Sequence, residues 1–209
     1  MRTKKERRAD FLKSEVLEAA SSLFKTNGIA GTTVDDIAKK SEYSKVTIYA
    51  YFKSKDDILN HLILEGMIYF RERVAALAAE KLGFKDFFTK LHRLIVELHE
   101  LQPVYFKGLA GAIPVSGKIF EDDATLRDIY RIGEEIHDIV LARLEQGKKE
   151  GFIKRPDLGV SAVLALWFSL CGMIEAASAK EEYIRLRTGF ERDQFLEEGA
   201  QLLLRSLIS

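Results

Sequence analysis

Apolar residues recur every three or four positions along almost the whole chain, which is the spacing of one face of an α-helix. In the first segment, Leu12, Val16, Ala19, Ala20 and Leu23 form one such stripe. No segment shows a convincing alternation of apolar and polar residues with a period of two, the pattern of a half-buried strand. The pattern therefore predicts an all-α protein.

Capping residues and helix breakers divide this pattern into about nine helices. Asn27-Gly28 is expected to end the first helix in a left-handed cap. Thr33 (or Thr32), Ser44, Ser54 and Asp157 are expected to begin later helices, because their side-chain oxygens accept hydrogen bonds from free backbone N–H groups. The expected helices after the first span about 33–40, 44–52, 55–82, 84–101, 124–150, 157–180 and 191–208, with one more short helix near 103–112 inside an irregular segment, 103–120.

Charge is distributed unevenly over a chain that is neutral as a whole. Residues 1–55 carry 12 Lys and Arg against 7 Asp and Glu, whereas residues 56–209 carry 20 against 25. A basic part in an otherwise acidic chain indicates a polyanionic partner for the basic part. We expect two domains, 1–54 and 55–209, because short helices give way to long ones near their junction.

The two short helices at 33–40 and 44–52 are joined by a turn of three or four residues, and the first helix braces them. This arrangement predicts a helix-turn-helix whose second helix enters the major groove of double-stranded DNA. On that second helix, Ile48 and Phe52 lie four residues apart and should pack inward, with Tyr51 alongside.

The opposite face of the second helix carries polar groups that can donate hydrogen bonds to DNA. Hydroxyls, a phenol and lysines can contact phosphates, lysine can also reach guanine, and small apolar side chains can contact a thymine methyl. Taken singly, Tyr49 also fits a packing aromatic, and Lys45 or Lys53 a solvated lysine. The combination predicts a DNA-binding face made of Thr33, Ser44, Lys45, Val46, Thr47, Tyr49, Ala50 and Lys53.

Residues 32–40, read TTVDDIAKK, and 44–59, read SKVTIYAYFKSKDDIL, closely resemble the signature of the TetR/AcrR family of transcriptional regulators. The resemblance is strong over residues 11–60 and extends beyond them only in helical layout. It implies a homodimeric repressor whose larger helical domain binds an unidentified small-molecule effector and dimerises. It also implies phosphate or groove contacts for Thr33, Ser44, Thr47, Tyr49 and Lys53, and sequence reading by Lys45, Val46 and Ala50.

Four positions depart from the usual family pattern. Glu42 replaces the usual Gly in the turn and Tyr43 a small aliphatic residue, while Val46 and Ala50 also differ from the common residues. Glu42 indicates either a turn without a left-handed residue or a strained turn. The changes bear on which operator is bound.

The N-terminal arm is basic and contains Arg2, Lys4, Lys5, Arg7 and Arg8. Such arms enter the minor groove or contact the DNA backbone. A solvated, disordered tail is an equally good interpretation for the free protein.

The helices expected at 157–180 and 191–208 combine long apolar stripes with small residues, which lets helices approach closely. Two such helices from each of two subunits would form a four-helix dimer interface. The alternative is burial within one subunit. The residues that we expect at the interface are Ala165, Gly172, Leu196, Ala200, Leu203 and Leu207.

A ligand cavity is implied by the family and weakly supported by the residues. The segment 103–114 is rich in apolar side chains and helix breakers and could line an entrance between helices. Candidate lining residues, each of which also fits an ordinary core position, are Phe70, Tyr105, Phe106, His137, Trp167, Phe168 and Cys171.

The sequence contains few residues that indicate a metal-binding or enzymatic function. Glu134 and His137 form one Glu-x-x-His pair, but a di-iron bundle needs two such pairs and two further Glu. No cofactor is expected, and a helical-bundle small-molecule or metal-binding enzyme is the alternative, followed by a co-regulator that binds protein. The single cysteine and the absence of an apolar leader predict a cytoplasmic protein. The apolar stretch 158–174 indicates a buried interface helix rather than a membrane span.

Overall fold

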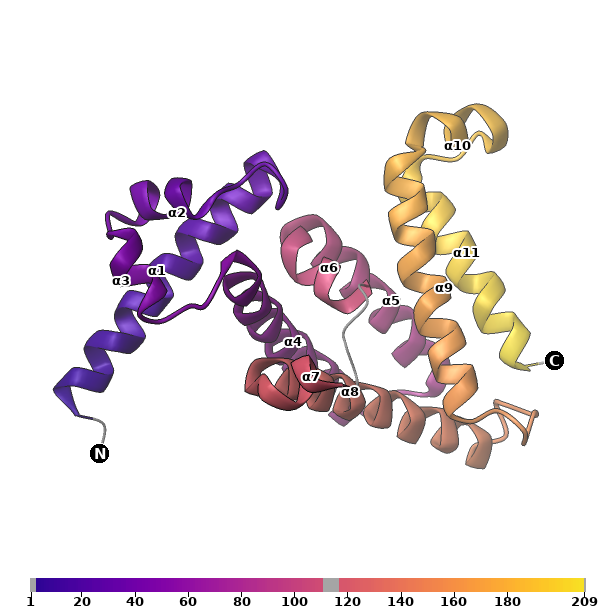
Figure 1. Cartoon of the computed structure of the whole chain (residues 1–209). Coiled ribbons are helices and arrows are strands. Elements are labelled where there is room, and N and C mark those ends of the chain that lie inside the picture. Colours follow the sequence, from indigo (N-terminus) through magenta and orange to yellow (C-terminus); the bar gives the residue numbers. More distant parts are fainter. Residues whose placement is uncertain (1–2, 111–116, 209) are drawn as a thin grey trace.

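The computed structural model describes residues 3–110 and 117–208, and these residues form eleven helices and no strand (Figure 1). The all-α prediction is therefore confirmed. The helices are α1 (Lys4–Asn27), α2 (Val34–Ser41), α3 (Lys45–Tyr49), α4 (Lys55–Ala79), α5 (Phe84–Leu101), α6 (Pro103–Ala110), α7 (Lys118–Asp122), α8 (Ala124–Lys149), α9 (Val160–Ala179), α10 (Glu181–Thr188) and α11 (Arg192–Ile208).

Two short helices, α7 and α10, were not expected from the pattern, and α9 begins later than predicted. The Asp157 carboxylate is paired with the Arg155 guanidinium at 2.6 Å, and Gly159 occupies the N-cap position of α9. Gly28 follows α1 with φ 73° but ψ 163°, so the predicted left-handed helical cap is not formed. These corrections concern helix ends, where local polar contacts decide the boundary.

The N-caps predicted for the helices around the turn are confirmed. The hydroxyl oxygens of Thr33, Ser44 and Ser54 accept hydrogen bonds from backbone N–H groups in the first turns of α2, α3 and α4, at 3.2, 3.0 and 3.1 Å. Each cap satisfies a backbone donor that the helix itself leaves free. Local sequence thus fixes where the two short helices and the long α4 begin.

The buried side chains form two apolar clusters. The N-terminal cluster joins α1, α2 and α3 to Ile58 and Leu62 of α4 and Val104 of α6, and the C-terminal cluster joins α4, α5 and α6 to the helices from α8 to α11. Tyr105 packs against both clusters. Helices α4 and α6 therefore connect the helix-turn-helix to the rest of the molecule.

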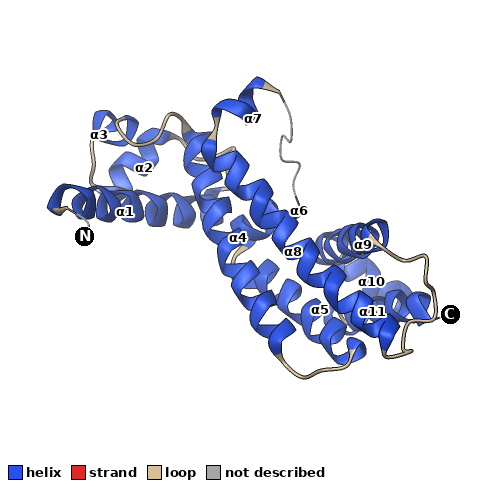
Figure 2. Cartoon of the chain, turned by 90° about the horizontal axis from the view of Figure 1, so that it is seen from below, coloured by secondary structure: helices blue, strands red, loops and turns tan. Residues whose placement is uncertain are grey.

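Figure 2 shows the N-terminal helices α1–α3 at one end of the molecule and α9–α11 at the other, with α4 and α8 running between them. Helix α4 packs against α8, α6 and α5. Among the described helices, α9 is the one that is long and apolar enough to cross a membrane by length and composition. In this structure α9 packs against α11, α8 and α5.

Candidate nucleic-acid interface

The short helix α3 is held to the protein by two buried side chains. Ile48 and Phe52 have relative exposures of 0% and 1%, and both belong to the N-terminal cluster with Ile37 of α2 and Val16 of α1. Helix α3 ends at Tyr49, earlier than predicted, but the Phe52 N–H still donates to the Ile48 carbonyl at 2.9 Å. The predicted inward face is confirmed.

The opposite side of α3 is open to solvent. Val46 is 81% exposed and Tyr49 is 53% exposed, although both are large apolar or aromatic residues that ordinarily favour burial. Of the predicted DNA-contacting residues, Thr33, Ser44, Lys45, Ala50 and Lys53 are also exposed, and Thr47 is half-buried. The structure therefore places all of them at the surface, with Thr33 at the start of α2 and the others on α3 and its two flanking turns.

The turn between α2 and α3 contains a left-handed residue. Glu42 adopts φ 59° and ψ 21°, a conformation that costs a residue with a Cβ about 1 kcal/mol or more. Its N–H and that of Tyr43 both donate to the Ala38 carbonyl. Of the two turns that the sequence allowed, the strained one is observed.

Tyr43 anchors this turn to α1. Its hydroxyl donates to the Glu15 carboxylate at 2.5 Å, and this bond raises the pKa of Tyr43 above its usual value. At the start of α2, hydrogen bonds from Thr33 lower the pKa of Asp36. Side chains of α1 and α2 thus fix the orientation in which α3 is presented.

The start of α4 is tied to the helix-turn-helix by polar contacts. The Lys53 N–H donates to the buried Asp57 carboxylate at 2.7 Å, and the Lys55 ammonium donates to the Ile29 and Thr32 carbonyls at 2.7 and 2.8 Å. The His61 ring stands edge-on to Phe52, with centroids 5.3 Å apart. Because burial outweighs the attraction of Asp57, the pKa of His61 is lowered.

An acidic residue, absent from the predicted DNA-contacting set, also lies on this face. Asp35, in the first turn of α2, forms an ion pair with Lys45 at 2.6 Å. The pair joins the first turns of the two short helices across the turn. Helical periodicity within α3 gives no signal for it, because the partner comes from another helix.

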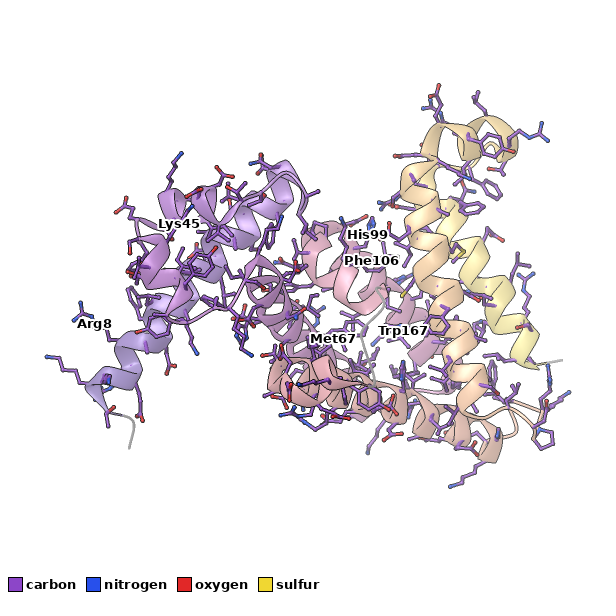
Figure 3. All side chains as sticks on the ribbon, in the orientation of Figure 1. Arg8, Lys45, Met67, His99, Phe106 and Trp167 are labelled. Atoms are coloured by element: carbon purple, nitrogen blue, oxygen red, sulfur yellow. The ribbon has the colours of Figure 1, made fainter. Side chains whose placement is uncertain are left out.

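The basic arm is helical from Lys4 onward. The Thr3 hydroxyl accepts a bond from the Glu6 N–H, and the Glu6 carboxylate accepts one from the Thr3 N–H, so the two residues form a capping box. The side chains of residues 4, 5, 7 and 8 are exposed, and Figure 3 shows Arg8 near the free end of α1. Arg2 lies outside the described residues. The expectation of a disordered tail is therefore corrected for residues 4–8.

At the other end of the molecule, the structure divides the six predicted interface residues between two environments. Leu196, Ala200 and Leu207 are buried within the chain, because α11 packs this stripe against α9 and α5. The expectation that this stripe faces a second subunit is corrected accordingly. Ala165 and Gly172 are exposed on α9, and Leu203 is half-buried on α11.

Phe168 and Leu202, each 64% exposed, lie on the outward faces of α9 and α11. Phe168 lies three residues from Ala165 and four from Gly172, so these three residues form one exposed stripe. The prediction that Phe168 lines a ligand cavity is therefore corrected, because the helix turns its ring to solvent.

The other predicted lining residues lie in or beside the core. The Trp167 ring lies 5.7 Å from Phe70 and 6.0 Å from His137, measured between centroids, which brings α4, α8 and α9 together. Phe106 and Cys171 are buried, and burial raises the pKa of the Cys171 thiol to about 12. Tyr105 is half-buried between the two clusters. Figure 3 shows Phe106 and Trp167 in the middle of the molecule; residues 111–114 of the expected entrance lie outside the described residues.

The Glu134 carboxylate and the His137 Nδ1 atom are 3.6 Å apart. Within the described part of the chain, no group of three or more His, Cys, Asp or Glu residues is arranged to hold a metal ion. The metal-binding alternative gains no support from this pair.

Known transcriptional regulators resemble this chain in sequence, including the segment that contains the helix-turn-helix. The sequence profile described as "Bacterial regulatory proteins, tetR family" matches residues 16–62, which extend from α1 into α4. The uncharacterized HTH-type transcriptional regulator YhgD of Bacillus subtilis is 25% identical over 166 residues, covering 76% of this chain and 81% of that protein. The HTH-type transcriptional repressor KstR2 of Mycobacterium tuberculosis is 23% identical, covering 85% of this chain and 91% of that protein.

A solved structure shares the fold over nearly the whole chain. The transcriptional regulator FadR from Bacillus subtilis, in complex with stearoyl-CoA, superposes with a TM-score of 0.68 at 22% identity, covering 94% of this chain and 97% of that one. All three proteins are named as transcriptional regulators, which gives the enzyme alternative no support. The matched segment contains the buried Ile48 and Phe52 and all of the residues predicted to contact DNA. Residues 16–62 of the chain therefore match the tetR family of bacterial regulatory proteins, and the chain as a whole shares the fold of the transcriptional regulator FadR.

Proposed function

We propose that the protein is a homodimeric repressor that binds a pseudo-palindromic operator and is released from it by a small, apolar effector. The observation that carries the proposal is the exposed side of α3, where Val46 and Tyr49 face solvent while Ile48 and Phe52 hold the helix down. A rigid helix of this kind, presented at the surface with hydroxyl and ammonium groups around it, suits the major groove.

The roles on this face divide by chemistry. Thr33, Ser44, Thr47, Tyr49 and Lys53 are proposed to contact phosphates, which set the position of the protein on DNA without reading its sequence. The residues proposed to read base edges are Lys45, Val46 and Ala50. The DNA-binding domain is proposed as residues 1–54, with residues 55–209 as the effector and dimerisation domain.

A second copy of the chain is proposed to cover the outward faces of α9 and α11. The exposed stripe of Ala165, Phe168 and Gly172, together with Leu202, would lose its contact with water in a four-helix interface. A two-fold dimer presents two recognition helices to two half-sites on one side of the duplex.

The effector is proposed to bind among α4, α8 and α9, near Phe70, His137 and Trp167. The structural relative FadR was solved with stearoyl-CoA, so long-chain acyl-CoA thioesters, in which the acyl chain is the apolar part and the coenzyme A group is charged, are the first class to test. A ligand that displaces α4 would move α3, because Lys53 and Lys55 tie the start of α4 to the helix-turn-helix. The effector must bind the DNA-free arrangement more tightly, since otherwise the equilibrium does not shift.

Selection of operators from random double-stranded DNA tests the DNA-binding proposal. We expect an enriched motif made of two inverted half-sites about one helical turn apart, bound by two chains. Recovery of unrelated sequences, or retention of DNA no better than by the Ile48→Ala variant, would contradict it.

The effector proposal is tested on the selected operator complex. Stearoyl-CoA should release the protein, whereas free coenzyme A at the same concentration should not. Trp167→Ala should weaken the response to stearoyl-CoA, and Tyr183→Ala, on exposed α10, is the matched aromatic control. Unchanged operator binding across acyl chains of different length would remove this effector class.

A further inference from the structure

The Asp35–Lys45 ion pair lies on the surface that we propose for DNA. Asp35 is the second residue of α2 and Lys45 is the first residue of α3, and their charged atoms are 2.6 Å apart. Their side chains are 57% and 49% exposed. Ion pairs this exposed to water contribute little to stability. The stability that this ion pair adds therefore does not explain why an acidic residue lies on a surface that approaches phosphates.

The spacing of the pair matches one feature of the major groove. A G·C pair displays the guanine O6 and N7 acceptors next to the cytosine N4 donor. The guanine O6 and the cytosine N4 are hydrogen-bonded to each other, so they lie about 3 Å apart. An ammonium and a carboxylate held at 2.6 Å present the complementary donor and acceptor at nearly the same separation.

We propose that Asp35 and Lys45 together read one G·C base pair in each half-site, with Lys45 donating to guanine and Asp35 accepting from the cytosine amino group. Asp35 is then a specificity-determining residue, contributed by α2 rather than by the recognition helix. This inference rests on the proposed operator binding and adds a named base pair to it.

The same pair discriminates against other DNA. An A·T pair places the adenine N6 donor next to N7, where guanine offers a second acceptor, so the Lys45 ammonium loses one partner. In the reverse orientation, thymine O4 and the adenine amino group can still pair with Lys45 and Asp35, but the thymine methyl group replaces the second acceptor that guanine offers, so Lys45 again loses one partner. Where no base amino group satisfies it, the Asp35 carboxylate is left near phosphates and repels them. Asp35 therefore weakens binding to unrelated sequences as well as favouring the correct one.

The test compares motifs selected by the unaltered protein, by Asp35→Asn and by Asp56→Asn. Asp56 occupies the same second position of α4 that Asp35 occupies in α2, so it controls for loss of one negative charge at a helix N-terminus. We expect the unaltered protein and Asp56→Asn to require a G·C pair at one position of each half-site. The Asp35→Asn protein should prefer G·C at that position about 5- to 150-fold less strongly than the unaltered protein does. Its base preferences at the other positions should be unchanged.

A double variant separates reading from a structural role. Asp36 and Thr33 still cap α2 when Asp35 is changed, so the Asp35→Asn protein should fold with an unaltered unfolding midpoint. Because the two residues read one base pair, Asp35→Asn combined with Lys45→Met should lose little more discrimination than either change alone.

The outcomes distinguish the two levels of the proposal. If Asp35→Asn selects the same motif with the same discrimination, or if the two losses add fully, the paired reading is wrong while operator binding stands. If the unaltered protein selects no motif, the proposed function itself fails.

Discussion

The helix-turn-helix and the pair formed by α9 and α11 both consist of amphipathic helices. They differ in how clearly the polar and apolar faces of those helices are separated. Around α3, polar groups lie on one side, and Ile48 together with Phe52, which follows the helix, packs on the other. On α9 and α11, apolar residues occur both inside and outside, so that Leu196 is 1% exposed and Leu202 is 64% exposed on the same helix. A helix that is apolar on both sides does not reveal from its sequence which side packs against its own chain.

The sharpest test of this difference is a matched pair of charge insertions on α11. Leu196→Glu places an unpaired carboxylate in the core and should destabilise the protein by more than about 4 kcal/mol. Leu202→Glu should leave the subunit folded and convert the dimer to a monomer. Denaturant unfolding and sedimentation measure the two effects. A stable dimer in the Leu202→Glu variant would show that the partner does not cover this face.

The corresponding pair on α3 is Ile48→Ala and Val46→Ala. Ile48 is fully buried, so its truncation should cost about 2–5 kcal/mol and abolish operator binding. Val46 is 81% exposed, so its truncation should change stability by about 0.5 kcal/mol or less and alter only base preference. Equal losses of stability in urea titrations would contradict the division of faces.

The contact between α4 and α6, the helices that connect the helix-turn-helix to the rest of the molecule, is tested at Gly66. A Cβ atom added there would lie 2.4 Å from the Tyr105 ring, where α4 crosses α6. Gly66→Ala should therefore cost about 1–3 kcal/mol. In the control, Gly133→Ala, the added atom meets Met67 at an ordinary 3.5 Å, and helix propensity favours Ala by about 1 kcal/mol. Calorimetry should show opposite shifts of the unfolding temperature, and shifts of the same sign would contradict the close approach.

The smallest predicted effect concerns the turn. Glu42→Gly relieves a left-handed conformation and should stabilise the protein by about 1 kcal/mol. Gly189 has φ 74° and no atom within 4 Å of an added Cβ, so Gly189→Ala should destabilise by a similar amount for conformational reasons alone. If Glu42→Gly is neutral or destabilising in denaturant unfolding, then Glu42 makes a favourable contact that offsets its strain.

The sequence predicted correctly those features that depend on neighbouring residues alone, namely the helix caps and the buried side of the recognition helix. The hydroxyls of Thr33, Ser44 and Ser54 cap the helices as predicted, because capping depends on residues three positions away at most. The inward Ile48 and Phe52 were predictable for the same reason, since i and i+4 share a helix face.

The features that sequence could not supply depend on contacts between distant segments. Asp35 meets Lys45 only because two helices cross, and Leu196 is buried only because α11 lies against α9 and α5. Helices α7 and α10 were missed although α2 and α3 are equally short, since Gly117 and Lys180 occupy their N-cap positions without a side-chain hydrogen bond that would signal a helix start. The left-handed turn at Glu42 is followed by the bond from the Tyr43 hydroxyl to Glu15 on α1, a contact between segments that the local sequence does not reveal.

The most direct test of the central claim is the salt dependence of operator binding. Contacts to phosphates release counterions, so the logarithm of affinity should fall steeply and linearly with the logarithm of salt concentration. Lys53→Ala removes one phosphate contact from each of the two bound chains, so it should reduce that slope by about two and weaken binding to all sequences alike. Lys85→Ala, which removes an exposed lysine of α5, should leave it unchanged. An affinity that does not change with salt, or a Lys53→Ala slope equal to that of the unaltered protein, would contradict the assignment of this face to DNA.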